Sequence, residues 1–304
     1  MIYTVTLNPA LDYFMEYNNV ENGAVNRTKL TRMTPGGKGI MESRMLSNLD
    51  VENTALGFVG GFTGKFIRES LEQHGIETDF TQIFGQTRVN VKVKTRSEET
   101  SLDAAGPDLT DEDVKRFLAK FDQLVKGDIV VFAGTVPKSL GENFYDQLIR
   151  EVKSRGAEFA IDIDGQKLLK TLPMKPLIVK PNREELEEIF SVKFDKKEDI
   201  FPYGQKLLEM GAQNAIVSMA GDGALLFTGN EIYFAPPVKG IIKNSVGAGD
   251  STVAGFLAEW SRSKNAVSAF KQGVACGTAK VFSEDMPSAR FIQKCFEQIQ
   301  VEMI

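Results

Sequence analysis

The feature that most constrains the fold is an alternation of short apolar segments with helical segments along most of the chain. The predicted strands are 2–7, 53–60, 78–84, 87–94, 128–133, 157–163, 177–180 and 214–219, with a hairpin over 225–234. Helical segments separate many of them by short connections. Such alternation favours parallel strands joined by right-handed crossovers, with helices covering the sheet. The sequence therefore predicts an α/β fold with a mostly parallel central sheet.

Composition excludes several classes of protein. The 304 residues carry a net charge of −5 and contain no basic block, which argues against binding to nucleic acid. No apolar run approaches the length of a membrane span, and MIYTVTLNPALD does not resemble a secretory signal. We therefore expect a cytoplasmic protein without nucleic-acid or membrane partners.

Cysteine and histidine offer little chemistry. Cys276 and Cys295 lack metal-type spacing, so we expect them to pack in the interior. The single histidine, His74, precedes Gly75 at the predicted end of a helix, where it suits the helix dipole. A histidine-based mechanism is therefore disfavoured.

A glycine turn at Ser245–Ser251 opens a helix near the C-terminal end of the chain. Gly247 and Gly249 allow successive N–H groups to converge on an anion in front of the helix. Asp250 beside that point could take a proton from a hydroxyl that attacks a phosphoryl group. A carboxylate that only complements the helix dipole explains Asp250 equally well.

Two segments near the N-terminus could form the other side of a site. Asp12 follows the first strand, at the edge where ligands bind in open α/β sheets, although it could simply stabilise a turn. Gly36, Gly37 and Lys38 open a helix, and this glycine-rich loop would let a ligand approach the backbone with a lysine beside it. The spacing differs from that of a Walker loop.

The strand 87–94 alternates apolar and polar residues. Arg88, Asn90, Lys92 and Lys94 share one face, which suits a phosphate-binding surface or a solvated edge strand. The segment therefore predicts a strand with one wet face.

Two further strand ends carry polar groups and glycines. Asn182 and Glu185 have the spacing of a helix-capping pair, and the same oxygens could organise magnesium through its water shell. Gly221 and Gly223 could pass beneath a flat base or form a plain turn.

Four stretches occur in one order: Asn8–Asp12, Gly36–Gly39, Asn182–Glu185 and Gly247–Asp250. As an ordered set they resemble the ribokinase-like (PfkB) family of sugar kinases. The resemblance implies a three-layer α/β/α fold over residues 1–304 as a single kinase domain. It also implies a small β-sheet lid built from about 13–34 and 85–105, through which lids pair to make homodimers.

Within the family, the first strand, the Gly-Gly-Lys-Gly loop, TRVNVKV and KPNREEL are most similar to bacterial 1-phosphofructokinases, followed by tagatose-6-phosphate kinases. The resemblance implies ATP-dependent phosphorylation of a ketohexose phosphate with magnesium. The first candidate reaction converts fructose 1-phosphate to fructose 1,6-bisphosphate.

The resemblance also implies roles for individual residues. Asp250 would be the catalytic base, and Gly247, Ala248 and Gly249 the backbone anion hole. The substrate would contact Asp12, Arg27, Gly36, Gly37, Lys38, Arg88 and Asn90, with Arg27 and Arg88 on its phosphate. ATP would contact Lys180, Asn182, Glu185, Ser218, Gly221, Gly223 and Ser283, and magnesium would be held by Asn182 and Glu185 through water.

The chain departs from the family at one point. Relatives usually read Gly-Lys-Gly-Ile-Asn-Val-Ser where this chain has Met41 and Glu42 in place of Asn and Val. Methionine offers no useful hydrogen bond to a sugar, and Glu42 adds a negative charge close to an anionic substrate. This departure supports an alternative, a sugar-phosphate sensor with weakened turnover.

Two other enzyme classes are disfavoured. A kinase for a neutral sugar does not need the cations Arg27, Lys38 and Arg88 around one pocket. A nicotinamide dehydrogenase would place a Gly-x-Gly-x-x-Gly turn after the first strand, which here leads to Asn8 and Pro9.

Overall fold

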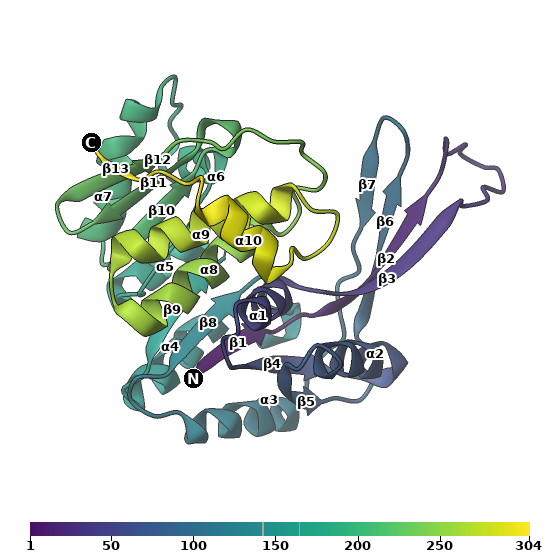
Figure 1. Cartoon of the computed structure of the whole chain (residues 1–304). Coiled ribbons are helices and arrows are strands. Elements are labelled where there is room, and N and C mark those ends of the chain that lie inside the picture. Colours follow the sequence, from purple (N-terminus) through teal and green to yellow (C-terminus); the bar gives the residue numbers. More distant parts are fainter. Residues whose placement is uncertain (142, 164) are drawn as a thin grey trace.

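The computed structural model describes residues 1–141, 143–163 and 165–304, which form a central sheet, a small second sheet and flanking helices (Figure 1). The strands of the central sheet are β1 Ile2–Thr6, β4 Asn53–Val59, β5 Glu77–Gln82, β8 Ile129–Ala133, β9 Glu158–Asp162, β10 Asn214–Ser218, β11 Ala224–Thr228, β12 Glu231–Ala235 and β13 Glu302–Met303. Strands β5-β4-β1-β8-β9 are parallel, and an antiparallel set β10-β11-β12-β13 follows.

Residues 177–180, predicted as a strand, join these two sets only through isolated parallel bridges at Val179. Val179 pairs with Ile161 on one side and with Ala215 on the other. Pro176 and Pro181 flank the segment and interrupt the ladder because proline donates no hydrogen bond, and the pairing resumes as a bridge between Asn182 and Ser218.

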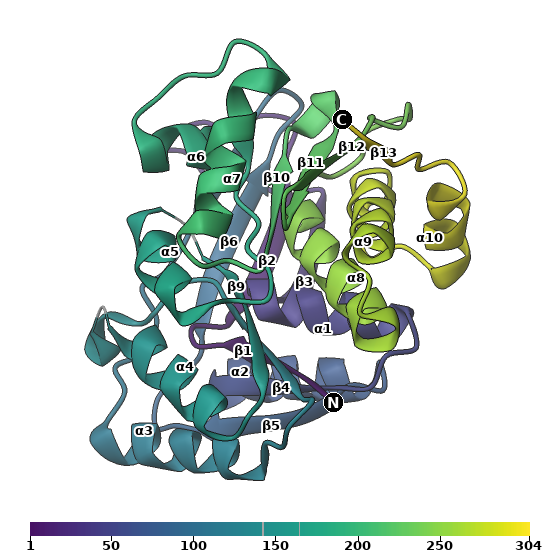
Figure 2. The ribbon, with the colours of Figure 1, turned by 90° about the vertical axis from the view of Figure 1, so that its left-hand side faces the viewer.

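Helices cover both faces of the central sheet (Figure 2). Their bounds are α1 Lys38–Asn48, α2 Gly61–Glu72, α3 Asp111–Leu118, α4 Phe144–Ser154, α5 Gln166–Thr171, α6 Arg183–Phe190, α7 Phe201–Glu209, α8 Ala248–Ser263, α9 Ala266–Val281 and α10 Ala289–Phe296. One core cluster joins the sheet to α3, α4, α5, α6 and α7, and a second joins it to α1, α8, α9 and α10. The strands read as continuous apolar runs because both faces are buried, and the predicted three-layer α/β architecture is confirmed.

Helices α8 and α9 pack very closely, and this fixes the start of α8. A Cβ added at Gly273 would lie 2.7 Å from the carbonyl oxygen of Thr252, and one at Gly255 would lie 2.7 Å from Sγ of Cys276. Cys276 and Cys295 are both buried in this layer, in agreement with the packing role predicted for them. The turn before α8 is therefore held on a rigid support.

The second sheet, here called the small sheet, has the order β3-β2-β6-β7 and projects from the main body (Figure 1). Its strands are β2 Ala10–Glu16, β3 Leu30–Gly36, β6 Arg88–Lys94 and β7 Glu99–Leu102. Asp12 lies opposite Thr34 and Asn90 in register, so these side chains share one face. That face looks toward the site described below.

Of the helices in the described ranges, none combines the length and the apolar character needed to cross a bilayer.

Candidate active site

A cavity of about 240 Å³ lies where the small sheet meets the starts of α1 and α8. Its walls are rich in charged and polar groups. They include Asn8, Asp12, Arg32, Thr34, Gly37, Lys38, Met41, Arg44, Arg88, Asn90, Lys92, Gly134, Thr135, Asn244, Asp250, Lys280, Glu284 and Asp285. The cavity therefore brings together residues from 8–92, 134–135 and 244–285, which are far apart in the sequence.

The start of α8 presents backbone donors beside Asp250. Gly247 adopts the left-handed conformation with φ of 79° and, as the N-cap, provides no side-chain acceptor. The Ala248 N–H donates to the carbonyl of Ser245 at 3.2 Å, whereas the N–H groups of Gly249 and Asp250 meet no acceptor among the described residues. These two donors are the ones free to bind an anion.

Asp250 shares its surroundings with a buried carboxylate and two lysines. Asp162, at the end of β9, lies 3.6 Å from Nζ of Lys38 and 4.0 Å from Nζ of Lys180. Burial first, and then the charge of Asp162, raise the pKa of Asp250 to about 7, although both lysines act to lower it. A carboxylate with this pKa is suited to general-base catalysis near neutral pH.

Lys180 lies under the glycine turn. A Cβ added at Gly249 would lie 2.7 Å from its Nζ, so the turn passes close to the end of the lysine side chain. Lys180 thus lies against the turn that opens α8. The ATP contact that the resemblance implies for Lys180 stays a prediction.

Glu42 lies beneath the cavity and does not line it. The side chain is fully buried, and neither carboxyl oxygen has a hydrogen-bond partner among the described residues. Burial, with the charges of Asp162 and Asp250, raises the pKa of Glu42 well above its ordinary value. The sequence predicted a negative charge close to the substrate at Glu42. The structure instead buries this carboxyl group, which favours its neutral form.

The sugar side of the cavity is built on the small sheet. Asn90 Nδ2 donates to Asp12 Oδ1 at 2.9 Å, and Gly36 packs so closely on Asp12 that a Cβ there would lie 2.2 Å from Oδ2. The Arg88 guanidinium donates to the carbonyl of Asn8 at 3.2 and 3.0 Å and to that of Ala104 at 2.9 Å. Contacts with the described residues use three of its five N–H donors, which leaves two for a ligand.

Arg27 is the predicted substrate residue that the structure keeps apart. It is exposed in the loop between β2 and β3 and is not among the residues that line the cavity of its own chain. The contact of Arg27 with the substrate phosphate stays a prediction.

The predicted nucleotide side lies at the ends of β10 and α9. Asn182 and Glu185 form a complete capping box, with Asn182 Oδ1 accepting from the Glu185 N–H and Glu185 Oε2 accepting from the Asn182 N–H, both at 2.8 Å. An isolated bridge places Asn182 beside Ser218. The Ser283 hydroxyl, after the end of α9, donates to the Ala279 carbonyl at 2.8 Å.

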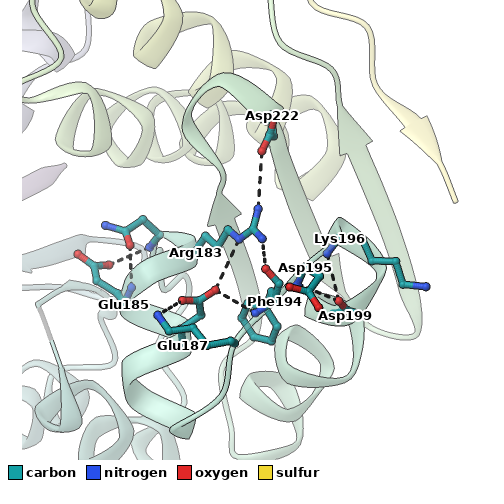
Figure 3. A network of polar contacts seen from close by, with 10 residues as sticks. Arg183, Glu185, Glu187, Phe194, Asp195, Lys196, Asp199 and Asp222 are labelled. Carbon is teal, nitrogen blue, oxygen red and sulfur yellow. Dashed lines mark hydrogen bonds and ion pairs between the residues drawn. The ribbon is translucent and has the colours of Figure 1, made fainter.

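Arg183 ties the start of α6 to the neighbouring turn (Figure 3). Its Nη1 lies 3.7 Å from Oδ2 of Asp222, which sits between Gly221 and Gly223, and its Nε lies 3.7 Å from Oε1 of Glu187. These contacts link the start of α6 to the Gly221–Gly223 turn, the two segments predicted to bind nucleotide.

The fit to magnesium is indirect. Among the described residues no group of three or more histidine, cysteine, aspartate or glutamate side chains could hold a metal. Each capping oxygen already accepts a hydrogen bond, and Glu185 Oε1 accepts none from the residues that the structure describes. This donor set fits magnesium held through its water shell and shared with phosphate oxygens.

Three site features escaped the sequence interpretation: Asp162, Lys280 and the ion pair of Arg44 with Asp285 at 3.0 Å. Asp162 ends a buried strand, the same signal that drew attention to Asp12, so it could have been found. Lys280 lies on the buried face of α9, and only the packing reveals it.

Comparison with known proteins supplies the family. Residues 5–287 match the model of the pfkB family of carbohydrate kinases. The chain belongs to this family. It is 47% identical over 301 residues to a 1-phosphofructokinase of Bacillus subtilis, covering 99% of both chains. It is 32% identical to a D-tagatose-1-phosphate kinase of Bacillus licheniformis, again over 99% of both chains.

A solved structure supports the same assignment. A putative phosphofructokinase from Staphylococcus aureus aligns with a TM-score of 0.89 and 40% identity, covering 100% of this chain and 99% of that one. The predicted membership of the PfkB family is confirmed.

The buried carboxyl of Glu42 should make the free energy of unfolding decrease as the pH rises. Because its pKa is raised in the folded state, the folded protein keeps a proton that the unfolded chain loses above about pH 4.3, so stability falls as pH rises. The variant Glu42→Gln removes this dependence, which for one group reaches about 1.4 kcal/mol per pH unit. Urea unfolding of both proteins between pH 5 and 8 measures the difference.

The exposed Glu52→Gln variant is the matched control and should follow the wild type at every pH. Parallel stability curves for wild type and Glu42→Gln would contradict the assignment of a neutral buried acid.

Proposed function

We propose that this protein transfers the terminal phosphoryl group of ATP to a ketohexose 1-phosphate, with fructose 1-phosphate as its main acceptor, in the cytoplasm. The observation that carries the proposal is the position of Asp250, with its raised pKa, beside two free N–H groups at the start of α8. Relatives named for fructose and for D-tagatose 1-phosphate chemistry support a ketohexose 1-phosphate. Because the two sugars differ at one carbon, D-tagatose 1-phosphate is the second candidate.

The chemistry is an in-line displacement. The acceptor hydroxyl oxygen bonds to the terminal phosphorus, its proton passes to Asp250, and the bond from that phosphorus to ADP breaks. The N–H groups of Gly249 and Asp250 stabilise the charge on the transferring group. Asn182 and Glu185 would hold the water shell of a magnesium ion, which neutralises charge on the phosphates when bound.

The remaining cavity residues position the acceptor. Asp12 and Asn90, already hydrogen-bonded to each other, offer acceptor and donor atoms to sugar hydroxyls. Arg88 and Lys38 line the same cavity and suit the phosphate already on the sugar. Positioning of this kind supplies a large share of the rate of phosphoryl transfer.

A coupled ADP-release assay tests the proposal. We expect the highest kcat/KM with fructose 1-phosphate, followed by D-tagatose 1-phosphate, and lower values with tagatose 6-phosphate, fructose 6-phosphate and fructose. EDTA should abolish turnover. If ketohexose phosphates bind but no magnesium-dependent ADP release occurs with any of them, the protein is a sensor and the proposal fails.

The base is tested by Asp250→Asn. The amide cannot accept the proton, so kcat should fall by about two to four orders of magnitude, while the dissociation constant of ATP stays within about twofold. Calorimetric titration with ATP provides the control for folding. Turnover equal to that of the wild type would exclude Asp250 as the base.

The pH profile provides an independent test. Asp250 must be deprotonated to act as a base, so kcat/KM should rise with pH and level off above about 7. Asp162→Asn removes the charge that raises this pKa, so the inflection should move to lower pH. The exposed Asp108→Asn variant is the control and should keep the wild-type profile. An unshifted inflection in Asp162→Asn would contradict the coupling.

We further propose that the small sheet, built mainly from the predicted segments 13–34 and 85–105, is a lid that pairs with a second copy of the chain. Its face away from Asp12 carries Tyr13, Met33, Val91 and Leu102, which are neighbours in register. Met33 and Leu102 are 49% and 59% exposed, so this face presents apolar side chains that a second copy could cover.

Sedimentation equilibrium tests the pairing. Wild type should be a dimer, and the double variant Met33→Asp with Leu102→Asp should be a monomer, because the charges cannot be buried together. Ile304→Asp, an exposed apolar position at the C-terminal end of the chain, should remain dimeric. A monomeric wild type would exclude the lid-paired dimer.

A further inference from the structure

The structure contains a buried lysine that the mechanism above does not use. Lys280, in the last turn of α9, is only 1% exposed, and its Nζ has no hydrogen-bond partner in the part of the chain that the structure describes. A buried ammonium without a partner is costly for the free protein. Its retention therefore requires an explanation outside the stability of the fold.

The side chain of Lys280 reaches the cavity next to the catalytic turn. It is among the cavity-lining residues, together with Asp250. A Cβ added at Gly247 would lie 3.7 Å from Lys280 Cε and 3.9 Å from Asp250 Oδ2. Lysine, carboxylate and the start of α8 thus surround one point.

Asp285, whose charge acts most strongly on Lys280 among the acids, does not neutralise it. Asp285 is engaged by Arg44, with 3.0 Å between Nη2 and Oδ2, and no ion pair within 4.0 Å joins Lys280 to an acid among the described residues. Burial, together with Arg44 and Arg32, lowers the pKa of Lys280, although Asp285 and Asp250 oppose this. An arriving anion would restore the charge that these surroundings disfavour.

We propose that Lys280 binds the phosphoryl group during transfer, as a catalytic residue that complements the N–H groups of Gly249 and Asp250. The proposal rests on the proposed function. The covalent changes remain those already described: Asp250 takes the proton of the acceptor hydroxyl, and ADP leaves. Lys280 donates hydrogen bonds to a non-bridging phosphoryl oxygen, whose charge is spread in the transition state.

The alternative ligand for Lys280 is the phosphate already present on the sugar. The geometry favours the transferring group. Lys280 adjoins Gly247 and Asp250 at the start of α8, whereas Arg88, proposed above to bind the phosphate of the sugar, belongs to the small sheet. If Lys280 binds the phosphate of the sugar, its removal weakens the binding of sugar phosphate in the absence of nucleotide. If Lys280 binds the transferring group, that affinity does not change, so binding experiments separate the two possibilities.

The test uses Lys280→Met, which keeps the length of the side chain and removes the charge. In the full-length enzyme we expect kcat with fructose 1-phosphate to fall by about 10²-fold, the usual loss for one transition-state donor, with KM for both substrates within about twofold. Magnesium, ADP, aluminium fluoride and sugar phosphate together form an analogue of the transition state. Its affinity, measured by calorimetry, should fall by a similar factor in the variant. Affinity for ADP alone should not change, and Lys280→Arg should recover part of the lost turnover.

Stability separates this role from a structural one. Because the free protein gains nothing from an unpaired buried ammonium, Lys280→Met should melt at the wild-type temperature or above. Lys271→Met, on the same helix and outside the cavity lining, is the matched control and should keep wild-type kinetics. A lower melting temperature with uniformly weaker binding would assign Lys280 to the fold and overturn the proposal.

The remaining outcomes show whether the inference about Lys280 or the proposed function fails. Unchanged kcat and unchanged analogue affinity in Lys280→Met overturn the proposal, as does weaker sugar-phosphate binding without nucleotide. If the wild type itself neither turns over nor binds the fluoride complex, the proposed function fails, and the inference about Lys280 falls with it. An active wild type with a fully active Lys280→Met rejects only the inference.

Discussion

The structure of the site depends on one constraint, the sharing of charge among Asp250, Asp162, Lys38 and Lys180 at the carboxyl edge of the parallel sheet. Burial first, and then the charge of Asp162 beside it, raise the pKa of Asp250 to about 7. The lysines hold Asp162, and one of them also supports the turn under Gly249. Strand order, helix packing and the glycine turn all serve to bring these groups together.

Much of this arrangement could be predicted from the sequence. The alternation of apolar runs and helices predicted the parallel sheet, because a strand buried on both faces is apolar throughout. Glycine turns and capping pairs are local signals, so Gly247 and Asn182 were identified as the starts of helices. The burial of Glu42 and the approach of Lys280 to Gly247 depend on contacts between distant segments, and a single sequence does not encode those distances in any local pattern.

The departures from the usual family sequence take on a different meaning in the structure. Met41 lines the cavity, and its Cε would lie 2.8 Å from a Cβ at Gly247, so it fills space beside the catalytic turn. Glu42 is enclosed below and favours its neutral form, so it does not repel an anionic substrate. The cavity keeps Asp250, with its raised pKa, and several cations. This combination supports the proposed phosphoryl transfer in preference to simple sensing.

The most direct test of this account is a crystal structure of the enzyme with magnesium, ADP, aluminium fluoride and fructose 1-phosphate. We expect the fluoride group to lie between the acceptor hydroxyl and ADP, in contact with the Gly249 N–H, with Asp250 hydrogen-bonded to that hydroxyl. A fluoride group bound away from the start of α8, or an acceptor hydroxyl out of reach of Asp250, would contradict it.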